Sequence, residues 1–143
     1  MLNVKVFDGK ITDNFNIAEF ACKGGGEVLL NRETLDHICR LQRFRDWFNR
    51  PMTINSGYRT AAYNAKVGGA KNSMHVQGIA TDFALPNEFY AYTKERQNEF
   101  LQNVKNKWFE ICAADGLGGG VGFYKTFIHL DGRKGKPAHW DGR

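Results

Sequence analysis

Residues 72–82 read NSMHVQGIATD, with a histidine at position 75 and an aspartate at position 82 on either side of Gly78. Neutral imidazole nitrogen and ionised carboxylate oxygen are common zinc ligands. Two ligands on one helical face need a spacing of three or four residues, whereas His75 and Asp82 are seven apart. The spacing therefore predicts a loop that carries His75, a turn at Gly78 and a strand that carries Asp82.

Side chains alternate along a strand, so the strand predicted over residues 79–84 has two different faces. Ala80, Asp82 and Ala84 point to one side, and the bulkier residues pack on the other. A metal site needs a third protein ligand, and the best candidate is His129 within FIHLD, residues 127–131. From spacing alone, a hydrogen-bonded structural His–Asp pair is the alternative to a metal site.

Composition indicates one globular domain over residues 1–143, long enough to bury a core. Hydrophobic residues make up 42% and charged residues 24%, which is ordinary globular usage. No apolar run reaches transmembrane length, and residues 1–9 lack the apolar segment of a secretory signal, so we expect synthesis in a cytoplasm. An odd number of cysteines, three, without a secretory signal argues against a disulfide framework, and the lack of CxxC spacing argues against cysteine zinc ligands.

The formal net charge of +5 would attract a polyanion such as nucleic acid or the bacterial cell wall. A nucleic-acid surface needs basic residues gathered on one face, with aromatic residues between them. Here the basic residues are scattered, with one local concentration at residues 133–136. We therefore predict no nucleic-acid partner.

Periodicity and capping signals predict an α+β fold: a small, mostly antiparallel sheet that carries the candidate metal ligands, flanked by helices. Asn16, with Glu19 three residues later, forms a capping box. His37 falls outside the apolar face of its helix and is expected to be solvated. The glycines at 118–120 are interpreted as a flexible approach to a strand. The expected elements are a strand or irregular lead-in over residues 1–13, helices over 14–22, 31–48, 60–65 and 86–114, and strands over 52–56, 79–84, 121–123 and 127–130.

Arg59 lies where the strand at residues 52–56 gives way to a loop, which is a usual place for a binding group. Its guanidinium can hold a carboxylate through two parallel hydrogen bonds. On the residue pattern alone, an ordinary surface ion pair is the more frequent role for such an arginine.

Several runs in a fixed order carry a resemblance to a known family. They are INSGYRT at residues 54–60, Asn64, VGGA at 67–70, the segment 72–82 and FIHLD at 127–131. Together they resemble the zinc D-alanyl-D-alanine carboxypeptidase family, hedgehog-like zinc peptidases that cut peptidoglycan peptides, and most closely its short phage and prophage branch. The resemblance runs from about Phe15 to Trp140.

The resemblance implies one zinc ion held by His75, Asp82 and His129, with a fourth position left open for water, as in catalytic zinc sites. It also implies that Arg59 contacts the substrate carboxylate or backbone. Tyr58 and Ser73 are expected to line the same cleft.

The residue that accepts the proton from the attacking water is less directly indicated. Asp131 is the first candidate, because it shares a strand face with His129. Many relatives carry the acidic residue three places before the last histidine, and that position here is Thr126. Asp131 is alternatively a partner that orients an imidazole. His139 is a further option, as the base or as a replacement ligand, against a plain solvated residue of the tail.

The function implied by the resemblance is hydrolysis of peptidoglycan stem peptides by a monomeric phage or prophage lysin that reaches the cell wall after release. D-Ala-D-Ala carboxypeptidase, D,D-endopeptidase and L-alanyl-D-glutamate endopeptidase activities all remain open. The alternative is a non-catalytic zinc module of the same fold that binds the cell wall, since the acid at position 126 is missing.

Overall fold

The computed structural model describes residues 9–143 and has an α+β fold, which confirms the predicted fold class. The first eight residues of the expected lead-in lie outside the described residues. In chain order the elements are the 3₁₀ helix η1 (Ile17–Phe20), helix α1 (Arg32–Phe48), strand β1 (Ile54–Ser56), helix α2 (Ala61–Lys66), strand β2 (Ala80–Ala84), 3₁₀ helix η2 (Asn87–Ala91), helix α3 (Lys94–Ala114), and strands β3 (Gly120–Phe123), β4 (Phe127–Asp131) and β5 (Ala138–Asp141).

The described strands form one sheet in the order β1-β2-β4-β3-β5. Neighbouring strands are antiparallel except β3 and β5, which run parallel, so the sheet is mostly antiparallel as predicted. Strand β5 was not predicted. Its four residues read AHWD, an apolar–polar alternation too short to predict a strand, and its partner β3 is separated from it in the chain by β4.

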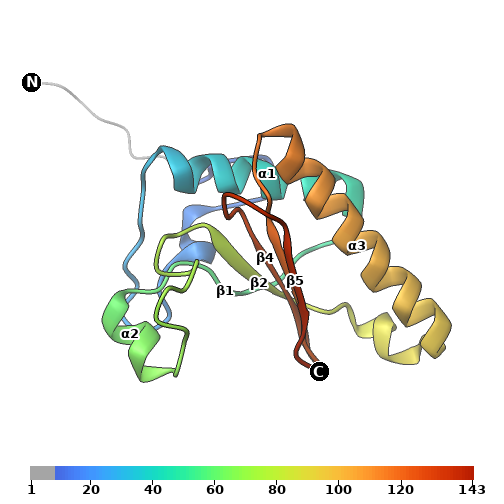
Figure 1. Ribbon diagram of the computed structural model, residues 1–143. Helices are drawn as coiled ribbons and strands as arrows, with labels where there is room; N and C mark the ends of the chain where they lie inside the picture. Colours follow the sequence, from blue (N-terminus) through green and yellow to red (C-terminus); the bar gives the residue numbers. More distant parts are fainter. Residues whose placement is uncertain (1–8) are drawn as a thin grey trace, which may run out of the picture.

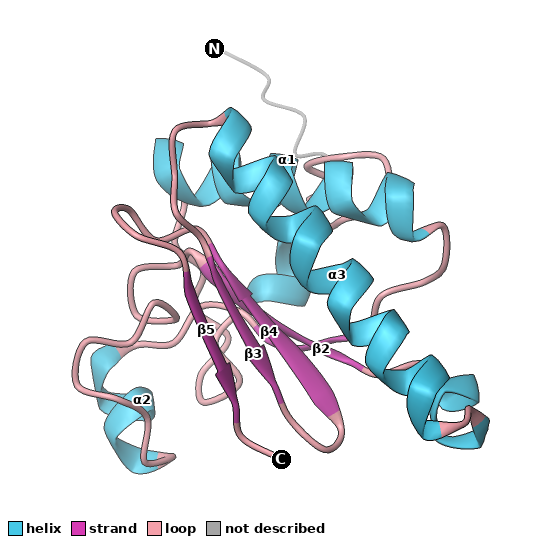
Figure 2. Ribbon diagram, turned by 45° about the vertical axis from the view of Figure 1, so that its right-hand side comes forward, coloured by secondary structure: helices cyan, strands magenta, loops and turns pink. Residues whose placement is uncertain are grey.

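The register of the strands places the site residues on one face of the sheet. Asp82 pairs with His129, His129 pairs with Gly122, and Gly122 pairs with Trp140. Paired residues on neighbouring strands point to the same side, so these four residues form one row across the sheet. We call this side of the sheet the metal face. In Figure 2 it is the side on which α2 lies.

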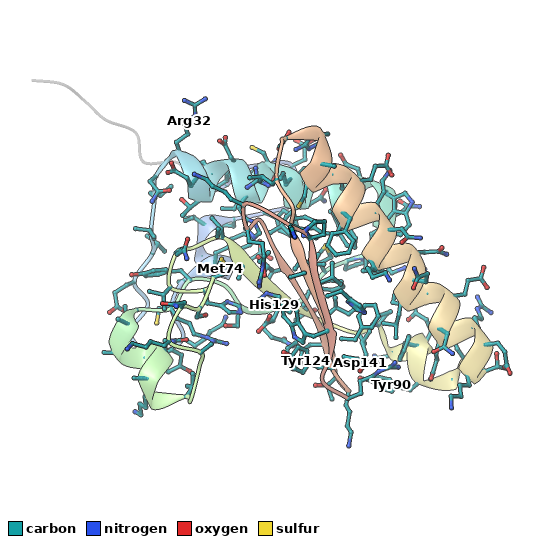
Figure 3. All side chains as sticks on the ribbon, in the orientation of Figure 1. Arg32, Met74, Tyr90, Tyr124, His129 and Asp141 are labelled. Carbon is teal, nitrogen blue, oxygen red and sulfur yellow. The ribbon has the colours of Figure 1, made fainter. Side chains whose placement is uncertain are left out.

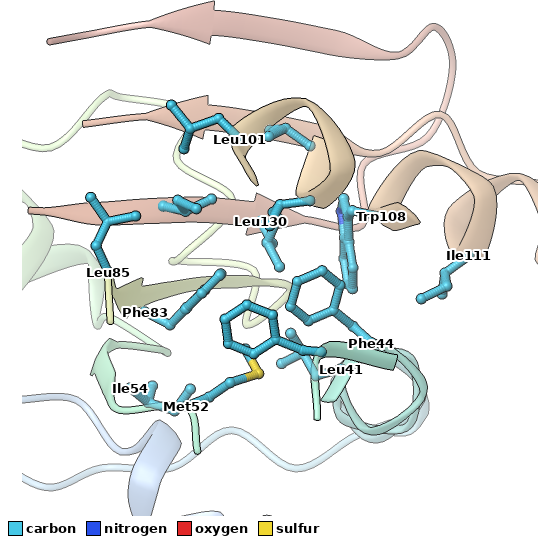
Figure 4. Close-up of a cluster of buried hydrophobic side chains, with 14 of the residues drawn as sticks. Leu41, Phe44, Met52, Ile54, Phe83, Leu85, Leu101, Trp108, Ile111 and Leu130 are labelled. Carbon is cyan, nitrogen blue, oxygen red and sulfur yellow. The ribbon is translucent and has the colours of Figure 1, made fainter. Parts of the chain in front are cut away.

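The opposite face packs against α1 and α3, which lie together on that side of the sheet (Figures 1 and 2). Figure 4 shows the core between them, where Phe44 of α1 meets Phe83 of β2 with ring centroids 5.8 Å apart and Trp108 of α3 at 6.2 Å. All three side chains are fully buried. Their burial removes a large apolar area from water and fixes the sheet against the two helices.

Helix α1 begins where the sequence predicted, because Asn31 and Thr34 form a reciprocal capping box. The prediction that His37 is solvated was wrong: only 1% of its surface is exposed. The sheet and α3 pack against adjoining sides of helix α1. They therefore bury a wider part of its circumference than its apolar residues alone occupy. The ring of His37 lies 2.9 Å from Thr81 Oγ1 and against Trp108.

The long helix predicted from Pro86 is two separate elements. Residues 87–91 form η2, Tyr92 is extended, and the side chain of Thr93 accepts a hydrogen bond from the Arg96 backbone to cap a new helix, α3. Helix α3 ends at Ala114, with Gly116 at φ +74° as predicted. Neither α3 nor any other helix within residues 9–143 is long and apolar enough to span a membrane.

Candidate metal centre

The structure brings the three predicted metal ligands together. One ligand atom from each of His75, Asp82 and His129 lies within 4.8 Å of the other two. His75 comes from the loop before β2, Asp82 from the middle of β2 and His129 from the middle of β4. At most 9% of each residue is exposed. Figure 3 labels His129, near the centre of the molecule, and Met74, the neighbour of His75 on the loop.

The orientation of His75 is fixed by its own loop and by the segment after β1. Its Nδ1 lies 2.7 Å from the carbonyl oxygen of Gly57, which can only accept, so Nδ1 carries the proton. Its Nε2 is then the unprotonated nitrogen, and it lies 3.2 Å from Asp82 Oδ1. The turn at Gly78 has φ +73°, the left-handed conformation that glycine adopts without strain, as the sequence predicted.

Gly57 allows the close approach that makes this orientation possible. A Cβ atom at this position would lie 2.7 Å from the Cα of Phe20, which is backbone and cannot move aside. Arg59, two residues after Gly57, holds the same loop, because its backbone N–H donates to the His75 carbonyl at 3.0 Å. The SGYR run at residues 56–59 therefore holds the loop that presents His75.

One oxygen of Asp82 faces both histidines. His129 Nδ1 lies 2.9 Å from Oδ1, the same atom that faces His75. Burial raises the pKa of Asp82, but its contacts with the imidazoles of His129 and His75 outweigh burial and lower the pKa to about 2. The carboxylate is thus ionised at neutral pH, as a metal ligand must be.

His129 uses its two ring nitrogens in different directions. Nδ1 faces Asp82, and Nε2 lies 2.8 Å from Asp131 Oδ2 on the other side of the ring. An ionised carboxylate only accepts, so Nε2 donates to Asp131. Burial lowers the pKa of His129, but its contacts with Asp131 and Asp82 outweigh burial and raise it. Of the two roles considered for Asp131, the geometry favours orienting the imidazole over accepting a proton at the metal.

Arg59 lies beside the ligand cluster. Its Nη2 is 3.7 Å from Asp82 Oδ2, its Nη1 donates to Asn64 Oδ1 at 3.2 Å, and its Nε donates to Ser56 Oγ at 3.3 Å. The side chain of Arg59 is 17% exposed. A guanidinium held in this way next to a metal site can receive the carboxylate of a bound substrate.

Three other residues that were considered for the site are Tyr58, Ser73 and His139. Tyr58 lines a small cavity with Phe20 and Ile38. The Oγ of Ser73 accepts the backbone N–H of His75 and so shapes the loop. His139 is exposed and neighbours Trp140 on β5, so it points away from the metal face, with Nδ1 donating to the Val121 carbonyl. The structure therefore does not bring His139 to the ligands.

The sequence analysis did not predict the roles of two groups of residues at this site. The first is Trp140 and Arg133, and the second is the glycines of β3. Trp140 lies beside His129, with ring centroids 5.2 Å apart, and Arg133 contacts Asp131. Gly120 belongs to β3 and not to a flexible approach to it, whereas Gly122 lies in the strand as predicted. A Cβ atom at Gly120 would lie 2.3 Å from Asp131 Oδ2, and one at Gly122 would lie 2.5 Å from Trp140 Nε1. The alternating glycines in GGGVG were the available signal.

A model of the family described as Peptidase M15 matches residues 13–131, which include all three candidate ligands. The chain belongs to the Peptidase M15 family. It is also 28% identical over 132 residues to the zinc D-Ala-D-Ala carboxypeptidase of Streptomyces albus G, an alignment that covers 86% of this chain and 47% of the relative. The chain therefore spans about half the length of the curated relative it matches.

The donor set of this M15 chain fits a divalent metal such as zinc. Two imidazole nitrogens and one carboxylate oxygen are the ligand types that catalytic zinc sites use, and such sites leave one position open. Each imidazole also donates its other ring N–H, to the carbonyl of Gly57 or to Asp131, as metal-bound histidines ordinarily do.

Proposed function

We propose that this protein is a zinc-dependent peptidase that hydrolyses peptide bonds in peptidoglycan stem peptides. The observation that carries the proposal is the buried cluster of His75, Asp82 and His129 in a chain of the Peptidase M15 family. The curated relative, a zinc D-Ala-D-Ala carboxypeptidase by name, supports both the metal and the class of substrate.

The residues would divide the work as follows. His75 Nε2, Asp82 and His129 Nδ1 would hold the zinc ion. When bound, zinc would polarise the attacking water and the scissile carbonyl. Arg59 binds a carboxylate of the stem peptide and positions the scissile bond next to Asp82. Asp131 holds His129, and Gly57 with Ser73 holds the loop that carries His75.

The finer assignments rest on the family resemblance. We propose a lysin of the phage or prophage type that acts on the cell wall after its release, as a monomer. The bond that it cuts is either the terminal D-Ala-D-Ala bond or an internal bond of the stem peptide, and product analysis decides between them.

A non-catalytic wall-binding module with the same zinc site is the second candidate, and one observation favours it. Thr126, at the position where many relatives carry an acid, is exposed in the β3–β4 hairpin. The carboxylate of Asp131 is already bound to His129 and Arg133. Neither residue is therefore a free base at the metal.

The test combines zinc content with mass spectrometry of the products released from purified peptidoglycan, for the wild type and the His75→Ala variant. One equivalent of zinc with released D-alanine or a cleaved stem peptide, both lost in the variant, would support the peptidase and name its bond. Bound zinc without any product would favour the binding module. A wild-type protein that binds no zinc would refute both.

A further inference from the structure

His129 is part of a closed circle of four side chains on the metal face. Its Nε2 donates to Asp131 at 2.8 Å, and Asp131 accepts from Arg133. The guanidinium carbon of Arg133 lies 5.2 Å from the ring centroid of Trp140, and the Trp140 ring lies 5.2 Å from that of His129. The sequence pattern of the circle is H-x-D-x-R-x₆-W, at residues 129–140.

Asp131 needs the charge of Arg133 because its carboxylate is completely buried. A buried carboxylate without a partner is strongly unfavourable, and one imidazole N–H satisfies only part of it. Arg133 supplies the rest: Nε donates to Oδ1 at 2.9 Å, Nη2 to Oδ2 at 2.7 Å, and the backbone N–H to Oδ1 at 3.1 Å. This bidentate contact fixes the plane of the carboxylate and therefore the direction from which the carboxylate contacts His129.

The rest of the sheet holds the circle in place. Trp108 donates its Nε1–H to the Asp131 backbone carbonyl at 2.8 Å from the helix side. On the metal face, Gly120 leaves the space that the Asp131 carboxylate occupies. The indole of Trp140 is fixed by a 2.7 Å hydrogen bond from Nε1 to Tyr124 Oη. Arg133 is thus confined between a fixed carboxylate and a fixed aromatic ring.

The chain contains a second copy of the same local sequence away from the ligand cluster. The pattern HxDGR occurs at residues 129–133 and again at 139–143. In the second copy Arg143 donates to Asp141 from its backbone N–H, Nε and Nη2 at 3.1, 2.9 and 2.7 Å, as in the first. Asp141 is exposed, and among the described residues no hydrogen bond joins it to His139, whose Nδ1 donates instead to the Val121 carbonyl. The same aspartate–arginine pair therefore occurs once at the metal centre and once away from it.

We propose that Arg133 is a positioning residue of the metal centre, which acts through Asp131 to hold His129 with Nδ1 directed at Asp82 and His75. This inference rests on the proposed zinc site. Among the described residues, Arg133 contacts Asp131 and Trp140 and makes no hydrogen bond or ion pair with the ligand atoms of the metal centre. It fixes the orientation of the Asp131 carboxylate, and Asp131 accepts the N–H of His129 Nε2, so that Nδ1 is free for the metal.

The test compares Arg133→Met with Arg143→Met, its matched control. Zinc dissociation constants are measured by competition with a chelator, and the tautomer of His129 in the metal-free protein is measured from its ¹⁵N shifts. We expect Arg133→Met to weaken zinc binding by about 10- to 100-fold and to move part of the His129 proton to Nδ1. Arg143→Met should change neither quantity.

Arg133→Lys separates orientation from charge and covers the case in which Arg133→Met fails to fold. Lysine keeps the positive charge but cannot make the bidentate contact. The zinc affinity of Arg133→Lys should therefore lie between those of the wild type and Arg133→Met. Thermal unfolding of each metal-free variant measures loss of stability separately. Wild-type zinc affinity in both Arg133 variants, or an equal loss in Arg143→Met, would overturn the proposal and leave the peptidase assignment standing. A wild type that binds no zinc would instead refute the zinc site itself.

Discussion

His129 binds Asp82 with one ring nitrogen and Asp131 with the other, at 2.9 Å and 2.8 Å. The two aspartates therefore have different tasks, although both are buried and both contact the same imidazole. Asp82 shares its contacted oxygen with His75 and lies where a metal would bind. Asp131 lies behind the ring. The predictions below separate these tasks experimentally.

Removing a ligand should remove the metal. His75→Ala and Asp82→Ala each leave two of the three protein donors, and we expect both variants to lose bound zinc and peptidase activity together. Metal content by elemental analysis and product release from peptidoglycan are the measurements. His139→Ala is the control, because His139 lies on the other side of the sheet. A full equivalent of zinc in His75→Ala would show that the site is misassigned.

Arg59→Ala should keep the metal and lose the substrate. Hydrogen bonds to a charged group contribute roughly 1.5–3 kcal/mol, so we expect kcat/KM to fall by about 10- to 100-fold. Arg59→Lys should recover only part of this loss, because lysine cannot hold a carboxylate at two points. Steady-state kinetics on a stem peptide, with zinc content determined in parallel, provide the measurement. Unchanged kinetics in zinc-loaded Arg59→Ala would contradict the binding role.

Asp131→Asn distinguishes orientation from proton transfer. An asparagine side-chain oxygen can still accept from His129 Nε2, so an orienting role predicts zinc affinity lower by about 10-fold and activity near that of the wild type once zinc is saturating. A general base instead contributes about 10²- to 10⁴-fold, and this loss would persist at saturating zinc. Activity measured as a function of zinc concentration decides between them, and the second pattern would restore Asp131 as the base.

Gly120→Ala should disturb the centre without touching a ligand. The new Cβ would lie 2.3 Å from Asp131 Oδ2, and this carboxylate cannot move because His129 and Arg133 bind it. Overpacking of this kind costs about 1–3 kcal/mol, which thermal unfolding would detect. Zinc affinity should fall as well. The control is Gly25→Ala, because the three heavy atoms nearest to its Cβ all belong to the side chain of exposed Glu27. Equal behaviour of the two variants would contradict the packing argument.

The protein should become less stable as the pH is lowered from 6.5 toward 3, because of the buried side chain of His37. Burial, together with the nearby charge of Arg40, lowers the pKa of His37 to about 3. Its unfolded value is about 6.5, so between these values the unfolded chain binds a proton that the folded chain does not. The contribution of His37 is therefore complete above pH 6.5 and is lost as the pH falls toward 3, at roughly 1.4 kcal/mol per pH unit.

Denaturant unfolding at several pH values between 6.5 and 5 tests this for the wild type and His37→Gln. Glutamine can keep a hydrogen bond to Thr81 but does not titrate, and other titrating groups, including Asp131 and His129 nearby, affect both proteins alike. As the pH is lowered, the free energy of unfolding should fall more steeply for the wild type than for the variant, by roughly 1.4 kcal/mol per pH unit. This difference corresponds to the one additional proton that the unfolded wild-type chain binds. Parallel slopes would mean that His37 is not a buried neutral group.

The sequence by itself determined the local features of the site. Spacing excluded a helical pair of ligands and predicted a loop for His75, a turn at Gly78 and a strand for Asp82, and these are present. Capping residues marked the start of α1 and of α2, because caps depend only on neighbours a few residues away. The same local pattern placed His129 and Asp131 on one face of β4.

Only the tertiary structure decided what each of these residues contacts. The burial of His37 depends on α3 and the sheet closing over α1, and the pairing of β5 with β3 brings Trp140 to His129. The position of His139 away from the metal face follows from that same pairing. These relationships join segments far apart in the chain, so no periodicity or spacing within one segment carries them. The roles of Asp131 and of the glycines in β3 became visible only once the strands lay side by side.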